Sequence, residues 1–189
     1  MMMSNRSNRR LPRIGTVARW RPIHLGHTPV LRALCQKSEL ALIGIGSSST
    51  YDYRNPFTLE ETEAMMRLVL PHDCNFTLIA VPDLQDGPRW RAMVRELFGD
   101  LDIFVTDNPY VRELLAEWYP VIKPVELVAD EDKIPLNATM VRQAMARGEH
   151  WQAMVPPAIA KYIEAHGLDT RFRAEFGLET LAIGSMTLP

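Results

Sequence analysis

The chain has 189 residues, a formal net charge of −2 at pH 7 and 47% hydrophobic residues, which allows one folded domain with a full core. A charge this close to zero excludes a general nucleic-acid-binding or membrane-binding surface, and no run reaches the roughly 20 apolar residues that cross a bilayer. The basic start of the chain has no hydrophobic stretch behind it, so we expect a cytoplasmic protein with a disordered arm over residues 1–12.

Strand-like and helix-like segments alternate along the chain. Apolar runs predict strands over residues 14–18, 40–46, 76–81, 101–106 and 121–128, and Pro124 makes the last one short, irregular or an edge strand. Helical spacing predicts helices over residues 28–36, 58–70, 89–98 and 109–118, and Thr58 with Glu61 is typical of a capping box. We therefore expect a Rossmann-like α/β domain over residues 13–168, with a parallel sheet of about five strands and helices on both faces. Residues 150–168 would form a C-terminal helical appendix, and residues 169–189 a weakly specified tail.

The two cysteines, Cys35 and Cys74, lack the spacing of a metal site or a C-x-x-C redox pair. Their wide separation in a chain of this length favours reduced thiols in a cytosol. A disulfide between them stays open as an alternative.

The polar segments of the chain follow the predicted strands. Ligands of parallel sheets bind beyond the carboxyl ends of the strands, and five segments fall there: residues 18–27, 46–57, 82–90, 106–108 and 133–142. Neither standard phosphate loop is present, because G-x-x-x-x-G-K-[ST] is missing and Gly44-Ile-Gly46 is followed by serines. A nucleotide would have to be held by other means.

The stretch from Arg19 to His27 is a basic elbow between the first strand and the first helix. A single histidine here would more often be a satisfied polar side chain than a ligand contact. Two histidines flanking Gly26, next to arginines, instead favour an arrangement of cationic and N–H donors that holds phosphates.

This elbow, Arg19-Trp-Arg-Pro-Ile-His-Leu-Gly-His27, resembles the histidine motif of the nucleotidyltransferase superfamily, and most closely that of archaeal-type nicotinamide mononucleotide adenylyltransferases. The chain departs from the family pattern at Ala18, Trp20 and Arg21, where the family has Gly, Phe and Gln. Four later segments are also similar to family motifs, and the resemblance runs from about residue 14 to residue 168: residues 46–58, 81–90, 104–108 and 137–142.

The resemblance implies roles for particular side chains. It assigns the catalytic work to the motif's basic residues, which are Arg19, His24, His27, Arg54 and Arg142. It implies contacts with ATP from Thr16, Ala18, Gly26, Thr106, Asn108 and Thr139, and contacts with the mononucleotide from Asp83 and Trp90. Structural interpretations compete with these roles, since residues 46–57 also fit a surface loop, Trp90 a core residue, residues 104–108 a turn and Asn137 a helix cap. Lys133 would supply one more charge, on a weak alignment.

The function that the resemblance implies is transfer of AMP from ATP to nicotinamide mononucleotide, which gives NAD and pyrophosphate. The mononucleotide's own phosphate would attack ATP, so no side-chain nucleophile is needed, and Mg²⁺ would arrive on the phosphates because no carboxylate cluster predicts a protein metal site. Related enzymes assemble as hexamers, so a homo-oligomer is expected, without nucleic-acid or membrane partners. Alternatives are the same chemistry on nicotinate mononucleotide, phosphopantetheine or a choline-type phosphate (a cytidylyltransferase-like reaction), and a non-catalytic nucleotide sensor, which Ala18 and Arg21 motivate.

Overall fold

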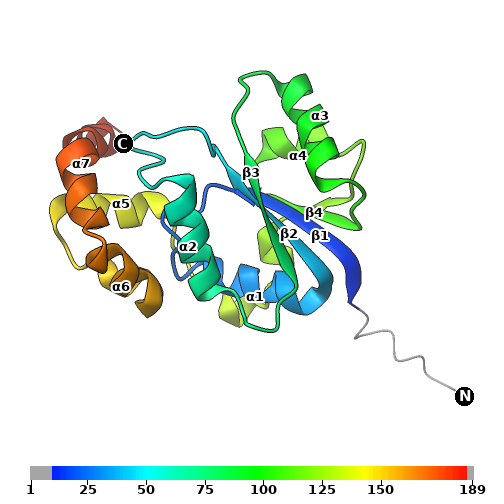
Figure 1. Ribbon diagram of the computed structural model, residues 1–189, viewed down its shortest axis with the longest axis horizontal. Coiled ribbons are helices and arrows are strands. Elements are labelled where there is room, and N and C mark those ends of the chain that lie inside the picture. The colour runs from blue at the N-terminus through cyan, green and yellow to red at the C-terminus, as the bar shows by residue number, and fades with distance from the viewer. Residues whose placement is uncertain (1–9, 187–189) are drawn as a thin grey trace, which may run out of the picture.

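The computed structural model describes residues 10–186, with side chains up to residue 183. Its centre is a parallel five-stranded sheet with the strand order β3-β2-β1-β4-β5 (Figure 1). The strands are β1 (Leu11–Ala18), β2 (Ser38–Gly46), β3 (Phe76–Val81), β4 (Ile103–Val105) and β5 (Val121–Ile122). The predicted α/β class is confirmed, and the predicted fifth strand is a two-residue edge strand that ends before Pro124.

Helices cover both faces of the sheet. Figure 1 shows α1 (His27–Lys37) and α2 (Leu59–Val69) on one face, and α3 (Gly87–Phe98) and α4 (Pro109–Leu115) on the other. A second group of helices, α5 (Ala138–Arg147), α6 (Pro157–Ala165) and α7 (Leu168–Met186), lies beside α2. No helix in the described part of the chain is long and apolar enough to cross a membrane.

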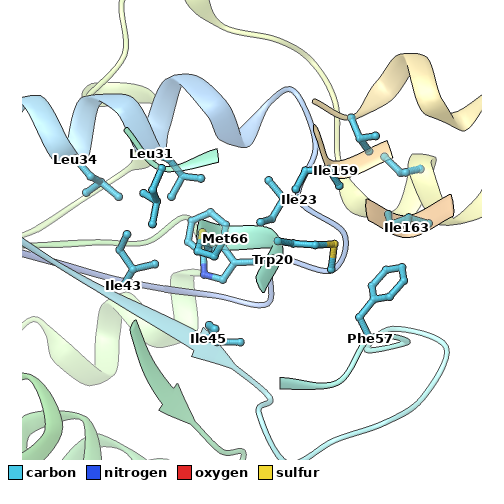
Figure 2. Close-up of a cluster of buried hydrophobic side chains, with 14 of the residues drawn as sticks. Trp20, Ile23, Leu31, Leu34, Ile43, Ile45, Phe57, Met66, Ile159 and Ile163 are labelled. Carbon is cyan, nitrogen blue, oxygen red and sulfur yellow. The ribbon is translucent and has the colours of Figure 1, made fainter. Parts of the chain in front are cut away.

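The core is divided by the sheet into two clusters, because successive strand residues point to opposite faces. Ile43 and Ile45 of β2 pack with α1, α2 and the C-terminal helices, whereas Leu42 packs with α3 and α4. Figure 2 shows the larger cluster, in which Trp20 and Ile23 of the basic elbow lie among these side chains. The elbow is therefore anchored in the core rather than carried on a free loop.

Helix α2 begins where the capping box predicts. The Thr58 hydroxyl accepts a hydrogen bond from the Glu61 backbone N–H at 3.2 Å, and the Glu61 carboxylate accepts one from the Thr58 N–H at 2.9 Å. The reciprocal pair satisfies backbone donors that the first turn leaves open.

Both ends of the chain differ from expectation. Strand β1 begins at Leu11, so residues 11 and 12 belong to the sheet and not to the predicted arm, whose residues 1–9 lie outside the described part. The expected tail over residues 169–189 is wrong for most of its length, because Leu168–Met186 form helix α7, which packs against α5 and places Phe172 in the larger core cluster. Residues 187–189 lie outside the described part.

The prediction of reduced thiols is also wrong, since Cys35 and Cys74 form a disulfide. Cys35 lies near the end of α1 and Cys74 just before β3, and their Cα atoms are 5.2 Å apart although 39 positions separate them in sequence. Parallel strands bring the segments that precede them to one edge of the sheet, and sequence spacing gives no sign of this.

Candidate active site

A cavity of about 910 Å³ opens at the carboxyl ends of the strands. Four of the five expected segments contribute to its lining, namely those that follow β1, β2, β3 and β4. The fifth, residues 133–142, does not line it. A volume of this size is in the range of small-molecule and cofactor sites.

Three arginines converge on one side of this cavity. Arg19 and Arg54 line it, while Arg142 lies behind them, buried, with its guanidinium donating to the Arg21 carbonyl oxygen at 2.8 Å and to the Thr139 hydroxyl at 3.2 Å. Burial, and then the positive charges of Arg19 and Arg54, lower the pKa of Arg142 to about 10. The charges of Arg19 and Arg54 therefore repel that of Arg142, and an anionic ligand would relieve this repulsion.

The two motif histidines stack on each other, with ring centroids 3.6 Å apart. His27 lines the cavity at the first turn of α1, and its Nδ1 accepts a hydrogen bond from the His24 backbone N–H at 3.3 Å. His24 lies behind it, buried, and is not part of the cavity wall. The Trp20 ring packs edge-on against the His27 ring, with the ring centroids 4.8 Å apart, and so supports it from another side.

Burial makes both imidazoles poor bases. It lowers the pKa of His24 to about 4, with a further contribution from the Arg142 charge, and lowers the pKa of His27 well below its usual value. Both rings are neutral at pH 7. Because His27 Nδ1 accepts a hydrogen bond, its proton lies on Nε2, so His27 offers an N–H donor rather than a positive charge.

Trp90 and Asp83 lie on the part of the wall that follows β3. Trp90 is in the first turns of α3, lines the cavity and also packs against the smaller core cluster. One part of the Trp90 surface therefore faces the cavity, and another part belongs to the core.

The remaining expected contacts fall into two groups. Those that line the cavity are Thr16, Ala18, Thr106 and Asn108. Gly26 and Thr139 do not, and a Cβ atom at Gly26 would approach His24 Nδ1 and two backbone oxygens to 3.0 Å, so this glycine permits close packing of the elbow. Lys133 lines a separate cavity of about 80 Å³ and pairs with Asp130.

Comparison with known proteins gives no matching family model. The chain is 32% identical over 156 residues to nicotinamide-nucleotide adenylyltransferase of Methanoculleus marisnigri, an alignment that covers 81% of this chain and 91% of that protein. It is 34% identical over 149 residues to the enzyme of the same name from Methanosphaerula palustris, covering 78% and 87%. The chain belongs to the nicotinamide-nucleotide adenylyltransferase family. The family resemblance of the sequence motifs is thereby confirmed, and the chain is a nucleotidyltransferase by descent.

Two solved structures share the fold of this adenylyltransferase family member. A bifunctional NMN adenylyltransferase/ADP ribose pyrophosphatase from Francisella tularensis, complexed with AMP and a manganese ion, aligns with a TM-score of 0.67 and 19% identity. The alignment covers 87% of this chain but 52% of that one, so the chain spans about half of the bifunctional protein. Nicotinic acid mononucleotide adenylyltransferase of Plasmodium falciparum, complexed with APC, aligns with a TM-score of 0.58 and 12% identity over 85% of this chain and 98% of that one.

The departure from the adenylyltransferase motif at Arg21 has a structural reason. This side chain is fully buried, and its guanidinium donates to the Ser47 carbonyl oxygen at 2.9 Å and to the Thr62 hydroxyl at 3.2 Å. Arg21 is not part of the cavity wall, and it connects the elbow to the loop after β2 and to helix α2.

Sequence reasoning missed several residues of the cavity wall. Asp52 Oδ1 accepts hydrogen bonds from the backbone N–H groups of Arg54 and Asn55, both at 2.8 Å, and so shapes the turn that carries Arg54. The described non-glycine residues with positive φ, Trp20, Ser47 and Gln85, all line the cavity. Such backbone conformations gather at functional sites. The Asp-x-x-Asn pattern of an Asx turn was the available signal for Asp52.

Proposed function

We propose that the chain transfers AMP from ATP to nicotinamide mononucleotide and forms NAD and pyrophosphate. The observation that carries this proposal is a single cavity with Arg19, Arg54 and His27 on its wall, together with Trp90 and Asp83. Basic and N–H donors suit the phosphates, and a flat indole suits a pyridinium ring, a contact worth about 0.5–2 kcal/mol.

In this reaction a phosphate oxygen of the mononucleotide forms a bond to the α-phosphorus of ATP. The bond from that phosphorus to the bridging oxygen of the β-phosphate breaks, and pyrophosphate leaves with the bonding electrons. No side chain becomes covalently attached, so the protein's contribution is alignment of the reactants and stabilisation of charge. Arg19 and Arg54 would neutralise phosphate oxygens, His27 Nε2 would donate a hydrogen bond to the leaving group, and Arg142 would add positive charge from behind them.

Divalent metal would enter as part of the ATP substrate. The described residues hold no group of three or more His, Cys, Asp or Glu side chains placed to bind a metal ion. Mg²⁺ coordinated by phosphate oxygens is the species that such a site would receive. We further expect a cytoplasmic protein that forms a homo-oligomer. Light scattering on the purified protein would measure the oligomeric state.

Two alternatives are separated by assay. Nicotinate mononucleotide differs from the amide in a charge, and the Asp83 carboxylate on the cavity wall would favour the uncharged amide. A nucleotide sensor without turnover was suggested by Ala18 and Arg21, and the buried packing role of Arg21 leaves only Ala18 to motivate it.

The decisive experiment supplies the purified protein with Mg²⁺, ATP or another triphosphate, and each mononucleotide in turn. Release of pyrophosphate and formation of NAD are measured together. We expect the highest kcat/KM with ATP and nicotinamide mononucleotide. Tight ATP binding without pyrophosphate release would contradict the proposal in favour of a sensor, and faster turnover of nicotinate mononucleotide would change the acceptor.

A further inference from the structure

The loop between β2 and α2, residues 47–58, has one side on the cavity and another on the C-terminal helix α7. Ser47, Asp52 and Arg54 line the cavity. Arg54 is exposed, and the contacts described for its side chain are with its neighbour Tyr53, whose hydroxyl accepts from Nε at 2.7 Å and whose ring lies 5.3 Å from the guanidinium carbon. The position of this guanidinium therefore depends on the position of the loop backbone.

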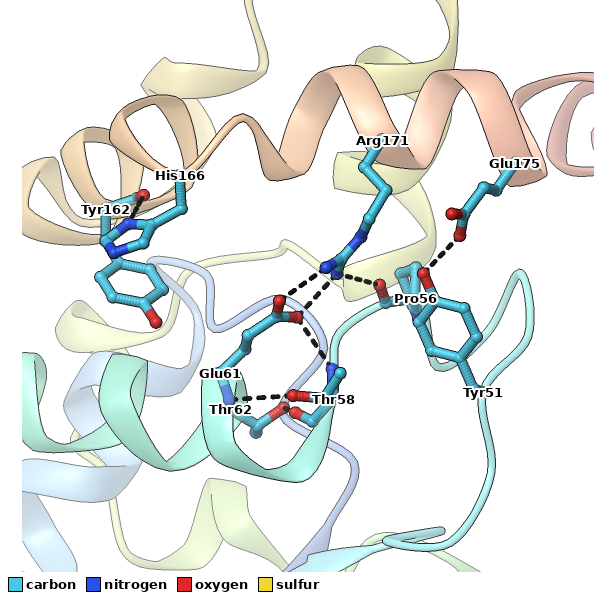
Figure 3. A network of polar contacts seen from close by, with 9 residues as sticks. All are labelled: Tyr51, Pro56, Thr58, Glu61, Thr62, Tyr162, His166, Arg171 and Glu175. Carbon is cyan, nitrogen blue, oxygen red and sulfur yellow. Dashed lines mark hydrogen bonds and ion pairs between the residues drawn. The ribbon is translucent and has the colours of Figure 1, made fainter.

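Arg171 of α7 holds the loop at its carboxyl end. Its guanidinium donates to both carboxylate oxygens of Glu61, at 2.6 and 2.7 Å, and to the Pro56 carbonyl oxygen at 3.1 Å (Figure 3). Glu61 also accepts the Thr58 backbone N–H, so one carboxylate joins α7 to the first turn of α2. A bidentate pair in a partly buried place is geometrically restrictive, and these side chains are 30% and 18% exposed.

Tyr51 provides a second attachment, earlier in the loop. Its hydroxyl donates to the Glu175 carboxylate (Figure 3). Its ring packs edge-on against Phe176, with the ring centroids 5.1 Å apart. Burial, and then the hydrogen bond to Glu175, raise the pKa of Tyr51 to about 12, so the phenol stays a donor over the physiological range. Arg54 lies between these two attachments, three residues after Tyr51 and two before Pro56.

We propose that Arg171 is a positioning residue for Arg54, and that α7 fixes the phosphate-binding loop from outside the cavity through Arg171 and Tyr51. Arg171 does not line the cavity, so it acts through the loop and not on the substrate. The inference rests on the proposed function in one respect, which is that Arg54 contacts the phosphates of ATP. The helix that the sequence suggested to be a tail would then be required for tight binding of the nucleotide.

The test is a double-mutant cycle on ATP affinity, measured by titration calorimetry on the full chain with Mg²⁺ and no mononucleotide. The variants are Arg171→Ala, Arg54→Ala and the combination of both. We expect Arg171→Ala to weaken ATP binding on the order of tenfold in the wild-type background and by less than about twofold when Arg54 is already Ala. A residue with a purely structural role would weaken binding by the same factor in both backgrounds, and that result would overturn the inference.

Arg173→Ala is the matched control, because Arg173 lies on the same helix and pairs with Asp169 one turn earlier, at 2.9 Å. We expect Arg173→Ala to bind ATP with wild-type affinity. If Arg173→Ala and Arg171→Ala lost ATP affinity equally, the proposal would be contradicted. Arg171→Lys keeps the charge but not the bidentate geometry, so it should recover part of the affinity. Thermal unfolding of every variant accompanies the titrations.

A second variant covers the case in which Arg171→Ala does not fold. Tyr51→Phe removes the hydroxyl that donates to Glu175 and should weaken ATP binding in the same direction, again only when Arg54 is present. Unchanged affinity in Tyr51→Phe and in a folded Arg171→Lys would overturn the proposal. Because calorimetry with ATP needs no turnover, absence of NAD formation would refute the proposed reaction and still leave the cycle as a test of the Arg171–Arg54 coupling.

Discussion

The His24 and His27 rings lie stacked at 3.6 Å with an angle of 25° between their planes. Burial lowers the pKa of both rings, because a charged imidazolium would lose its hydration there. Repulsion from His24 lowers the pKa of His27 further. Both histidines are therefore uncharged in the ligand-free protein at neutral pH. A neutral ring can offer a bound phosphate a hydrogen bond but not a positive charge.

Stability should therefore fall as the pH is lowered from 7.5 to 5. Between the lowered folded-state pKa and the ordinary value of 6.5, the unfolded chain binds more protons than the folded one, so the histidines' contribution is complete above about pH 6.5 and is lost below it. Lowering the His24 pKa from 6.5 to about 4 corresponds to roughly 3 kcal/mol of unfolding free energy, lost as the pH falls from the first value to the second. Urea unfolding at several pH values measures this, and His24→Gln should flatten the profile. Bound ATP should reduce this loss of stability, because the negative phosphates favour the protonated rings of the folded protein. A stability that does not change with pH over this range would contradict the lowered pKa of the two histidines.

His27→Ala should lower kcat far more than it weakens binding of either substrate. The Nε2–H donor is expected to meet the charge that develops on the departing pyrophosphate, and removing one such donor lowers turnover on the order of 100-fold. Steady-state kinetics and ATP titration check this, with the exposed His72→Ala as control. A near-wild-type kcat in His27→Ala would remove this residue from the mechanism.

Arg142→Ala should raise the KM for ATP about tenfold and leave that for the mononucleotide comparatively unchanged. The buried guanidinium adds positive charge behind Arg19 and Arg54. Arg147→Ala, on the exposed side of the same helix, is the control and should have wild-type constants. If mononucleotide affinity suffers instead, the triphosphate has been assigned to the wrong half of the cavity.

Trp90→Ala should weaken mononucleotide binding on the order of 1–3 kcal/mol, whereas Trp90→Phe should keep part of the affinity, because a flat ring is retained. Fluorescence titration gives the affinity and thermal unfolding the stability. Trp118 packs on the same core cluster without lining the cavity, so Trp118→Ala should destabilise the fold and leave affinity unchanged. Normal mononucleotide binding in folded Trp90→Ala would assign Trp90 to the core and remove the main support for a pyridine nucleotide.

Cys74→Ser should destabilise the protein by about 2–4 kcal/mol, since the disulfide closes a long loop between α1 and β3. Urea unfolding with and without reductant measures the difference. Wild-type protein under reducing conditions should match the variant, and equal stability of oxidised wild type and Cys74→Ser would show that the bond contributes nothing.

Features that depend on neighbouring residues in the chain could be predicted from the sequence. Alternating apolar runs predicted the parallel sheet, Thr58 and Glu61 predicted the start of α2, and the elbow from Arg19 to His27 indicated the family. Periodicity, capping and motif spacing are local properties, because each is set by backbone geometry over a few residues.

Properties that depend on residues distant in sequence became visible in the folded structure. The neutral state of His24 and His27 follows from burial, and for His24 also from the charge of Arg142, which is more than 100 positions away. The disulfide joins cysteines 39 positions apart, and Tyr51 meets Glu175 across 124 positions. The helix over Leu168–Met186 has no strong periodic face, and its role comes from what Arg171 contacts once the chain has folded. Desolvation and long-range contact exist only when the chain is compact, and the order of residues does not reveal them.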